Sequence, residues 1–242
     1  MSGLLRTRGL TVAFGGVTAL DRVDFQIGEG ELRCIIGPNG AGKSTFFKCI
    51  TGQVAPLRGE IEFDGQSVLG FDTHQVARRG IGIKMQVPQL FDGLDVWENV
   101  WLAARVNHDN QTSNKIATRV VERANIASLA RRRAGYLAHG QRQLVEFAMV
   151  LAGEPKLILL DEPAAGMTAD ESGRMADMIR EVNRTAAVIV IEHDMQFVRR
   201  IAGTITVFNQ GSILIEDRAE VVLGDRIVRQ IYLGKQGKTF DA

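Results

Sequence analysis

A glycine-rich segment near the amino terminus has the residue types needed to bind a phosphate. Residues 37–44 read GPNGAGKS and fit the pattern G-x-x-x-x-G-K-[ST]. The three glycines allow backbone N–H groups to surround a phosphate without a clashing Cβ. Lys43 would then reach the outer phosphates, and the Ser44 hydroxyl would bind Mg²⁺. The alternative is a glycine-rich turn that binds nothing, and the Lys-Ser pair argues against it.

Two adjacent carboxylates follow a second apolar run. Residues 157–160 read LILL, and Asp161 and Glu162 come directly after them. This pattern is typical of a central parallel strand that delivers acidic side chains at its carboxyl end. Asp161 suits a water-mediated Mg²⁺ contact, and Glu162 suits a general base for water. Two acids here could instead begin a turn, but the upstream phosphate loop favours the chemical interpretation.

One histidine and one short segment before a helix are weaker indications of a phosphate-binding site. Residues 186–191 predict another buried strand, which is followed by Glu192 and His193. A single histidine after a strand is usually structural, but this strand is expected beside the one that ends in Glu162. Residues 136–141 (YLAHGQ) precede a predicted helix, and their small side chains leave N–H groups that could hold an anion.

An aromatic residue, Phe14, ends an alternating apolar segment just before Gly15 and Gly16. Such alternation over residues 10–14 predicts a strand that closes in a turn. An aromatic ring close to the phosphate loop could stack on a purine, a contact worth ~1–3 kcal/mol per base. Taken alone, Phe14 is expected in the core, because large apolar side chains are usually buried.

The composition indicates a globular chain without a strong charge preference. The chain has 242 residues, 45% of them hydrophobic, and its 29 Lys and Arg nearly balance its 28 Asp and Glu. This balance favours neither nucleic acid nor an anionic membrane surface as a partner. No apolar run approaches the roughly 20 residues of a membrane span, so we expect a soluble chain unless a partner holds it at a membrane. Cys34 and Cys49 lie in apolar surroundings, as buried thiols in a reducing cytoplasm would.

The elements that must position these residues form an α/β pattern. The apolar residues 32–36 predict a strand that enters the phosphate loop, and a helix is expected over 44–50. Alternating segments around 10–14, 23–27 and 61–65 predict an antiparallel layer beside that strand. Further predicted elements are a strand at 81–86, helices at 73–79, 97–106, 114–130, 169–184 and 219–233, a polar loop at 107–114, and a hairpin at 204–215.

In their order and spacing, these motifs resemble the nucleotide-binding subunits of ATP-binding cassette (ABC) transporters. Residues 37–45 resemble the Walker A loop, 157–162 the Walker B strand and 137–141 the signature motif, while Gln86 matches the Q-loop and His193 the switch histidine. The resemblance covers nearly the whole chain. It implies an α/β P-loop NTPase cassette over residues 1–242, with a mixed core sheet, an antiparallel β subdomain and a helical subdomain inserted at about 88–152.

The resemblance also implies ATP and Mg²⁺ as ligands and assigns roles to individual residues. Phe14 becomes the adenine-stacking aromatic, which reverses the expectation from burial. Gln86 would contact Mg²⁺ and sense a transmembrane partner, and His193 would hold the γ-phosphate. The implied catalytic residues are Lys43, Glu162 and His193, and the implied metal ligands are Ser44, Gln86 and Asp161. The implied nucleotide-binding residues are Phe14, Gly37, Pro38, Asn39, Gly40, Ala41, Gly42, Lys43, Ser44, Thr45, Gln86, Ala138, His139, Gly140, Gln141 and His193.

Two parts of the chain depart from the family pattern. Ala138 replaces the signature serine, whose hydroxyl touches the γ-phosphate held by the opposite subunit, and His139 replaces the first signature glycine. Thr168 stands where an aspartate is common in the loop after the Walker B strand. Together with residues 192–199 and 232–234, these changes resemble the branch that imports branched-chain amino acids and, more closely, urea and short amides.

The resemblance implies the ATP-hydrolysing subunit of an uptake transporter, in the cytoplasm and peripheral on the inner face of the membrane. Two copies, or one copy and a paralogue, would hold each ATP between one chain's Walker A loop and the other's signature helix. Transmembrane permease subunits would dock near Gln86 and the helical subdomain, and a periplasmic solute-binding protein would act through them. The alternatives are an exporter of lipid or lipopolysaccharide, and a soluble ABC ATPase acting on nucleic acid, which usually carries a coiled coil or a second cassette.

Overall fold

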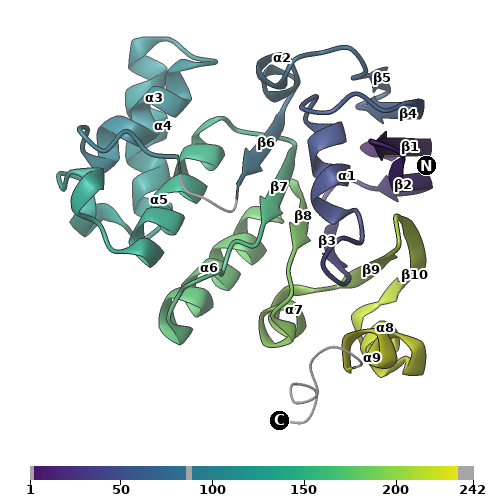
Figure 1. Ribbon diagram of the computed structural model, residues 1–242. Helices are drawn as coiled ribbons and strands as arrows, with labels where there is room; N and C mark the ends of the chain where they lie inside the picture. The colour runs from purple at the N-terminus through teal and green to yellow at the C-terminus, as the bar shows by residue number, and fades with distance from the viewer. Residues whose placement is uncertain (1–2, 86–88, 234–242) are drawn as a thin grey trace.

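A six-stranded sheet forms the centre of the computed structural model, which describes residues 3–85 and 89–233 (Figure 1). The strand order is β10-β9-β3-β8-β7-β6, and every neighbouring pair is parallel except β10 with β9. The carboxyl ends of β3, β8 and β7 therefore meet at one edge. The strands are β3 (Leu32–Ile36), β6 (Ile81–Lys84), β7 (Leu157–Asp161), β8 (Ala187–Ile191), β9 (Thr204–Asn209) and β10 (Ser212–Arg218).

A second, antiparallel sheet lies beside the first, as the alternating segments predicted. Its strand order is β2-β1-β4-β5. Phe14 and Val17 pair across the turn between β1 and β2, where Gly15 and Gly16 both have positive φ. The turn therefore needs residues without a Cβ. The strands are β1 (Leu5–Phe14), β2 (Val17–Ile27), β4 (Arg58–Phe63) and β5 (Gln66–Ser67).

The central strands are apolar throughout because both faces of their sheet are covered. In β7, Ile158 and Leu160 pack in a cluster with the helices on one face, whereas Leu157 and Leu159 pack with α1 (Lys43–Ile50) and the antiparallel sheet. Alternate residues of a strand point to opposite faces, so a strand covered on both sides must be continuously hydrophobic. The fold class predicted from the sequence is confirmed.

The segment between β6 and β7 is mainly helical where it is described, and it lies on the side of the core away from the antiparallel sheet (Figure 1). The predicted loop at 107–114 is wrong over its second half, because the Asp109 carboxylate accepts the Thr112 N–H (2.7 Å) and starts a helix there. That helix also ends earlier than predicted, before Asn125 at φ 51°. The helices are α3 (Val96–Arg105), α4 (Asn110–Arg123), α5 (His139–Ala152) and the short turns η1 (Ala127–Leu129) and η2 (Ala134–Tyr136).

Further helices lie before β6 and after β7 in the chain. The predicted single helix at 219–233 is two helices, because the Asp225 carboxylate accepts the N–H groups of Ile227 (2.7 Å) and Val228 (3.0 Å) and begins a new one. Within residues 3–85 and 89–233, no helix has the length and apolar character needed to cross a membrane. These helices are α2 (Thr73–Arg78), α6 (Ala169–Val182), α7 (Met195–Ile201), α8 (Ala219–Gly224) and α9 (Arg226–Leu233).

Candidate nucleotide site

The phosphate loop connects β3 to α1, as its sequence predicted. A Cβ at Gly37 would overlap the carbonyl oxygen of Phe208, and a Cβ at Gly42 would lie 2.5 Å from the carbonyl oxygen of Ala19 in β2. Any larger residue at these positions would push the loop away from the neighbouring strands. The second contact also places the β1–β2 hairpin against the loop.

The loop and the helix after it present free hydrogen-bond donors. No side chain among the described residues caps α1, so N–H groups of its first turn remain available at the positive end of the helix. The Lys43 ammonium folds back over the loop, where Nζ donates to the carbonyl oxygens of Gly37 (2.6 Å) and Pro38 (3.1 Å). Burial lowers the pKa of Lys43, and the carboxylates of Glu162 and Asp161 oppose that shift. These features fit a bound nucleotide phosphate.

The two carboxylates lie at the end of β7, facing the loop. Burial raises the pKa of Asp161, the charge of Glu162 raises it further, and Lys43 opposes both. Glu162 has φ 48°, unusual for a residue with a side chain, and its N–H donates to the carbonyl oxygen of Ile191 (2.9 Å). The adjacent strand β8 thus helps to hold Glu162 in this backbone conformation.

His193 lies beside Glu162, as their strand ends predicted. Its Nδ1 is 3.4 Å from Glu162 Oε1 and 3.9 Å from Glu192 Oε2. The imidazole is 63% exposed, whereas the Glu162 side chain is 26% exposed. The structure therefore places a partly shielded carboxylate next to an accessible imidazole, at the sheet edge that carries the phosphate loop.

Phe14 is not a core residue, so the expectation from its apolar type alone is wrong. The ring is 51% exposed at the end of β1. It lies in the hairpin that contacts Gly42 through Ala19, and is therefore on the loop side of the molecule. This position suits a ring that stacks on a base beside the phosphates.

The signature segment begins α5 and contacts the loop that follows Glu162. Ala138 is the exposed N-cap residue, and its N–H donates to Gln141 Oε1 (3.1 Å). His139 Nε2 lies 3.2 Å from the carbonyl oxygen of Ala165. A Cβ at Gly140 would overlap the Glu171 carboxylate at the start of α6. The imidazole that replaces a glycine therefore joins two motifs of the same chain.

The other departure, Thr168, acts as a helix cap. Its Oγ1 accepts the Glu171 N–H (3.3 Å) and donates to Glu171 Oε2 (2.9 Å), and its own N–H donates to the same carboxylate (3.0 Å). This capping box fixes the start of α6.

Two buried acids were not singled out in the sequence. Glu192 is 1% exposed, and its carboxylate accepts three backbone N–H groups next to Glu162 and His193. Glu146 in α5 forms a buried ion pair with Lys84 at the end of β6 (3.4 Å). The sequence feature that could have indicated a buried ion pair at Lys84 is a charged residue within an otherwise apolar strand. Gln86, the predicted Q-loop residue, lies outside the described residues.

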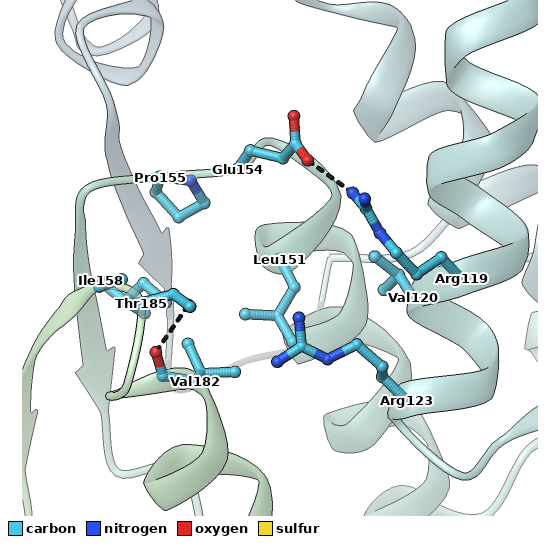
Figure 2. A pocket seen from close by; sticks show the side chains of 10 residues that line it. Arg119, Val120, Arg123, Leu151, Glu154, Pro155, Ile158, Val182 and Thr185 are labelled. Carbon is cyan, nitrogen blue, oxygen red and sulfur yellow. Dashed lines mark hydrogen bonds and ion pairs between the residues drawn. The ribbon is translucent and has the colours of Figure 1, made fainter.

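A separate cavity of about 280 Å³ opens between α4, α5, α6 and the amino end of β7 (Figure 2). Figure 2 shows Arg119 paired with Glu154 at its rim, and Arg123 is paired with Glu181. Because both guanidinium groups already have carboxylate partners, the cavity has no surplus charge for an anion. None of the predicted site residues lines it.

The fold and the site define a P-loop nucleotide-binding protein. Its strand, glycine-rich loop and helix lie beside a strand that ends in acidic residues. This arrangement is typical of proteins that bind and hydrolyse nucleoside triphosphates. The sequence profile of ABC transporters matches residues 20–165. The chain therefore belongs to the ABC transporter family, and it is an ATP-binding, ATP-hydrolysing cassette.

The relatives and the solved structures that resemble this chain match it over most of its length. BraF of Pseudomonas aeruginosa, a high-affinity branched-chain amino acid transport ATP-binding protein, is 34% identical over 96% of this chain and 98% of its own length. The ADP conformation of MJ1267, an ATP-binding cassette of an ABC transporter, superimposes with a TM-score of 0.87 at 28% identity, covering 97% of this chain and 100% of that one. MJ0796 was solved as a dimer in a post-hydrolysis state with ADP and Pi, and matches with a TM-score of 0.79 at 26% identity over 88% of this chain and 98% of that one.

Proposed function

We propose that this chain powers a membrane importer by hydrolysing ATP between two cassettes, with Glu162 as the general base and His193 on the γ-phosphate. The observation that carries these roles is the Glu162–His193 contact at the sheet edge that also presents Lys43 and the phosphate loop. Phe14 stacks on the base, and the remaining residues of the Walker A loop surround the phosphates.

Mg²⁺ would complete this site together with the nucleotide. Among residues 3–85 and 89–233, no group of three or more His, Cys, Asp and Glu side chains is arranged to hold a metal ion alone. Mg²⁺ is commonly held by one or two protein groups, substrate phosphates and water. The Ser44 hydroxyl and the Asp161 carboxylate suit that pattern, with Gln86 as the third predicted ligand.

The arrangement of the motifs supports a dimer. The phosphate loop and α1 pack on one face of the central sheet, whereas α5, which the signature segment begins, packs on the other. Ala138, the N-cap residue of α5, has no side-chain acceptor, so the N–H groups of the first turn of this helix can donate to a phosphate. We therefore infer that the signature of a second copy, or of a paralogous cassette, completes each site, as the dimeric MJ0796 structure suggests for that protein.

A groove between the core and the helical segment suits the permease subunits. It has a volume of about 310 Å³, is mainly apolar, and includes Ile83 and Met85 from β6 and its end, and Ala103, Met149 and Val150 from α3 and α5. An amphipathic helix can bind in such a groove with its apolar face buried. Permease docking there would hold the chain on the inner face of the membrane, and a periplasmic solute-binding protein would act through the permeases.

The relatives and the departures from the family pattern support the proposed solute class. BraF is named for branched-chain amino acid transport, and the variant motifs resemble those of urea and short-amide importers. The test is ATP hydrolysis by the chain reconstituted with the permeases encoded beside its gene. Stimulation by a binding protein loaded with a branched-chain amino acid, urea or a short amide is expected. Stimulation by lipid or lipopolysaccharide instead would indicate an exporter, and co-purification with nucleic acid rather than permeases would indicate the soluble class.

A further inference from the structure

We propose that Glu192 is a positioning residue for ATP hydrolysis: its buried carboxylate holds the loop after Glu162 and the backbone of His193 together, and so sets the separation of that pair. This inference rests on the roles proposed above for Glu162 and His193. It assigns to Glu192 no contact with the nucleotide.

The contacts of Glu192 connect two loops. Oε1 accepts the N–H of Ala164 at 3.1 Å, and Oε2 accepts the N–H groups of His193 at 3.0 Å and Asp194 at 3.4 Å. Ala164 follows Glu162 by two residues, and His193 and Asp194 follow the end of β8. One carboxylate therefore spans the two segments that carry the proposed base and the proposed γ-phosphate contact.

The backbone at Glu192 is also tied to the strand that leads into the phosphate loop. Its N–H donates to the carbonyl oxygen of Ile35 in β3 at 3.3 Å. On the other side, the Glu162 N–H donates to Ile191. Glu192 thus stands at the point where the ends of β3, β8 and β7 meet, with its side chain buried and the next side chain, His193, exposed.

The burial of this acid has a cost that the fold could avoid. Burial raises the pKa of Glu192, and its three backbone N–H partners act in the opposite direction. An apolar residue here would avoid burying a charge. It would also leave the three N–H groups without this acceptor. A purely structural role predicts lower stability on substitution, whereas positioning also predicts a specific loss of turnover.

The Glu192→Gln variant separates these possibilities, because an amide has one acceptor oxygen and must turn its NH₂ group toward one of the two loops. The full chain is assayed at concentrations where activity per chain no longer rises. We expect kcat to fall about 10–100-fold, the scale of a misplaced catalytic group, while ATP affinity changes less than about twofold because the phosphate loop is untouched. A kcat within about twofold of wild type would overturn the inference.

A double-mutant cycle with His193→Ala tests whether Glu192 acts through the pair. In that background Glu192→Gln should reduce kcat by less than about threefold, because the separation it sets no longer matters. The same fold-reduction in both backgrounds would mean a general structural effect and would overturn the inference. Should the amide variant be insoluble, Glu192→Asp serves in its place, since the shorter side chain cannot span both loops.

Glu31→Gln is the matched control. Glu31 also accepts a backbone N–H, from Gly28 at 3.0 Å, but it lies at the amino end of β3, opposite the phosphate loop. We expect its kcat to match wild type. Unchanged kcat in both Glu162→Gln and His193→Ala would refute the proposed site roles and this inference together. Large losses there with none in Glu192→Gln would refute this inference alone.

Discussion

At the scale of single residues, Glu162 is the group proposed to distinguish hydrolysis from binding. Its carboxylate is partly shielded and lies 3.4 Å from His193 Nδ1, and its backbone N–H donates to the carbonyl oxygen of Ile191 in β8. Such a group can accept a proton from water while leaving the phosphate contacts to the loop.

Glu162→Gln should therefore keep ATP binding while steady-state hydrolysis drops by ~10²–10⁴-fold, the usual contribution of a general base. The measurement pairs nucleotide binding with phosphate release on the same preparation. Hydrolysis near the wild-type rate would remove Glu162 from the mechanism. Loss of ATP binding would instead mean that the amide disturbs the phosphate loop.

Phe14→Ala should weaken ATP binding by about 1–3 kcal/mol, the contribution of one stacked base. The ring is exposed and lies in the hairpin beside the phosphate loop, so its removal leaves no core cavity. Binding of inorganic triphosphate, which has no base, should not change. Val17→Ala is the control, because Val17 is 71% exposed and pairs with Phe14 across the turn. Equal losses for both ligands would exclude base stacking.

At the scale of elements, one buried ion pair joins the core sheet to the helical segment. Lys84 ends β6, Glu146 lies in α5, and both side chains are almost completely buried. Glu146 Oε1 also accepts the N–H of Gln89, just beyond the Q-loop position. The pair thus connects two elements that are far apart in sequence, at the place where the permeases are proposed to act.

Lys84→Met should destabilise the chain by roughly 3–5 kcal/mol, because it leaves a buried carboxylate without its partner. The double variant Lys84→Met with Glu146→Leu should recover most of this loss. Denaturant unfolding measures both. Lys156→Met is the control: its ion pair with Asp64 is largely exposed, so stability should hardly change. No recovery in the double variant would contradict this account.

The stability of the Lys84→Met variant should depend on pH in a defined direction. Burial raises the pKa of Glu146, and Lys84 partly opposes the shift. Without Lys84 the pKa rises further. A carboxyl with a raised pKa in the folded state stabilises the fold below its ordinary pKa, and this stability is lost as pH rises through the raised value. The deficit of Lys84→Met relative to wild type should therefore be smaller at about pH 5 than at about pH 8.

At the scale of the whole molecule, the departures in the signature bear on the dimer. Ala138 has no hydroxyl that could contact the γ-phosphate across the proposed dimer interface. The His139 Nε2 atom lies 3.2 Å from the Ala165 carbonyl oxygen of its own chain, so this nitrogen already has a polar contact. The ATP-bound homodimer should accordingly be weak.

Ala138→Ser should tighten that dimer. A hydrogen bond to a charged group is worth roughly 1.5–3 kcal/mol. The homodimer would form two of them, one in each site, which corresponds to about 10²–10⁴-fold in the dissociation constant. The comparison is made by light scattering in the Glu162→Gln background, where ATP persists, with ADP as the monomeric control. If Glu162→Gln remains monomeric at high ATP and protein concentration, self-pairing fails, and a paralogous cassette becomes the expected partner.

The parts of the site that are contiguous along the chain could be predicted from the sequence. The loop at 37–44, the acids at the end of β7 and the histidine after β8 each depend on a few successive residues, whose backbone conformation follows from glycines, apolar runs and strand ends. Parallel strands bring their carboxyl ends to one edge, so even the approach of Glu162 and His193 could be predicted. The predicted helix boundaries differ from the structure at Asp109 and Asp225, because a single carboxylate that caps a helix has the same sequence pattern as a polar loop residue.

The contacts between segments that are distant in sequence depend on the tertiary structure and could not be predicted from local patterns. Glu192 accepts the Ala164 N–H, Lys84 pairs with Glu146, and His139 reaches Ala165, because the order of the strands and the packing of α5 bring these groups together. The exposure of Phe14 likewise depends on how the β1–β2 hairpin packs and could not be predicted from its residue type. The residue type limits which interactions a side chain can make. Its burial and its partners depend on which other elements pack against it, and local sequence periodicity does not show which elements those are.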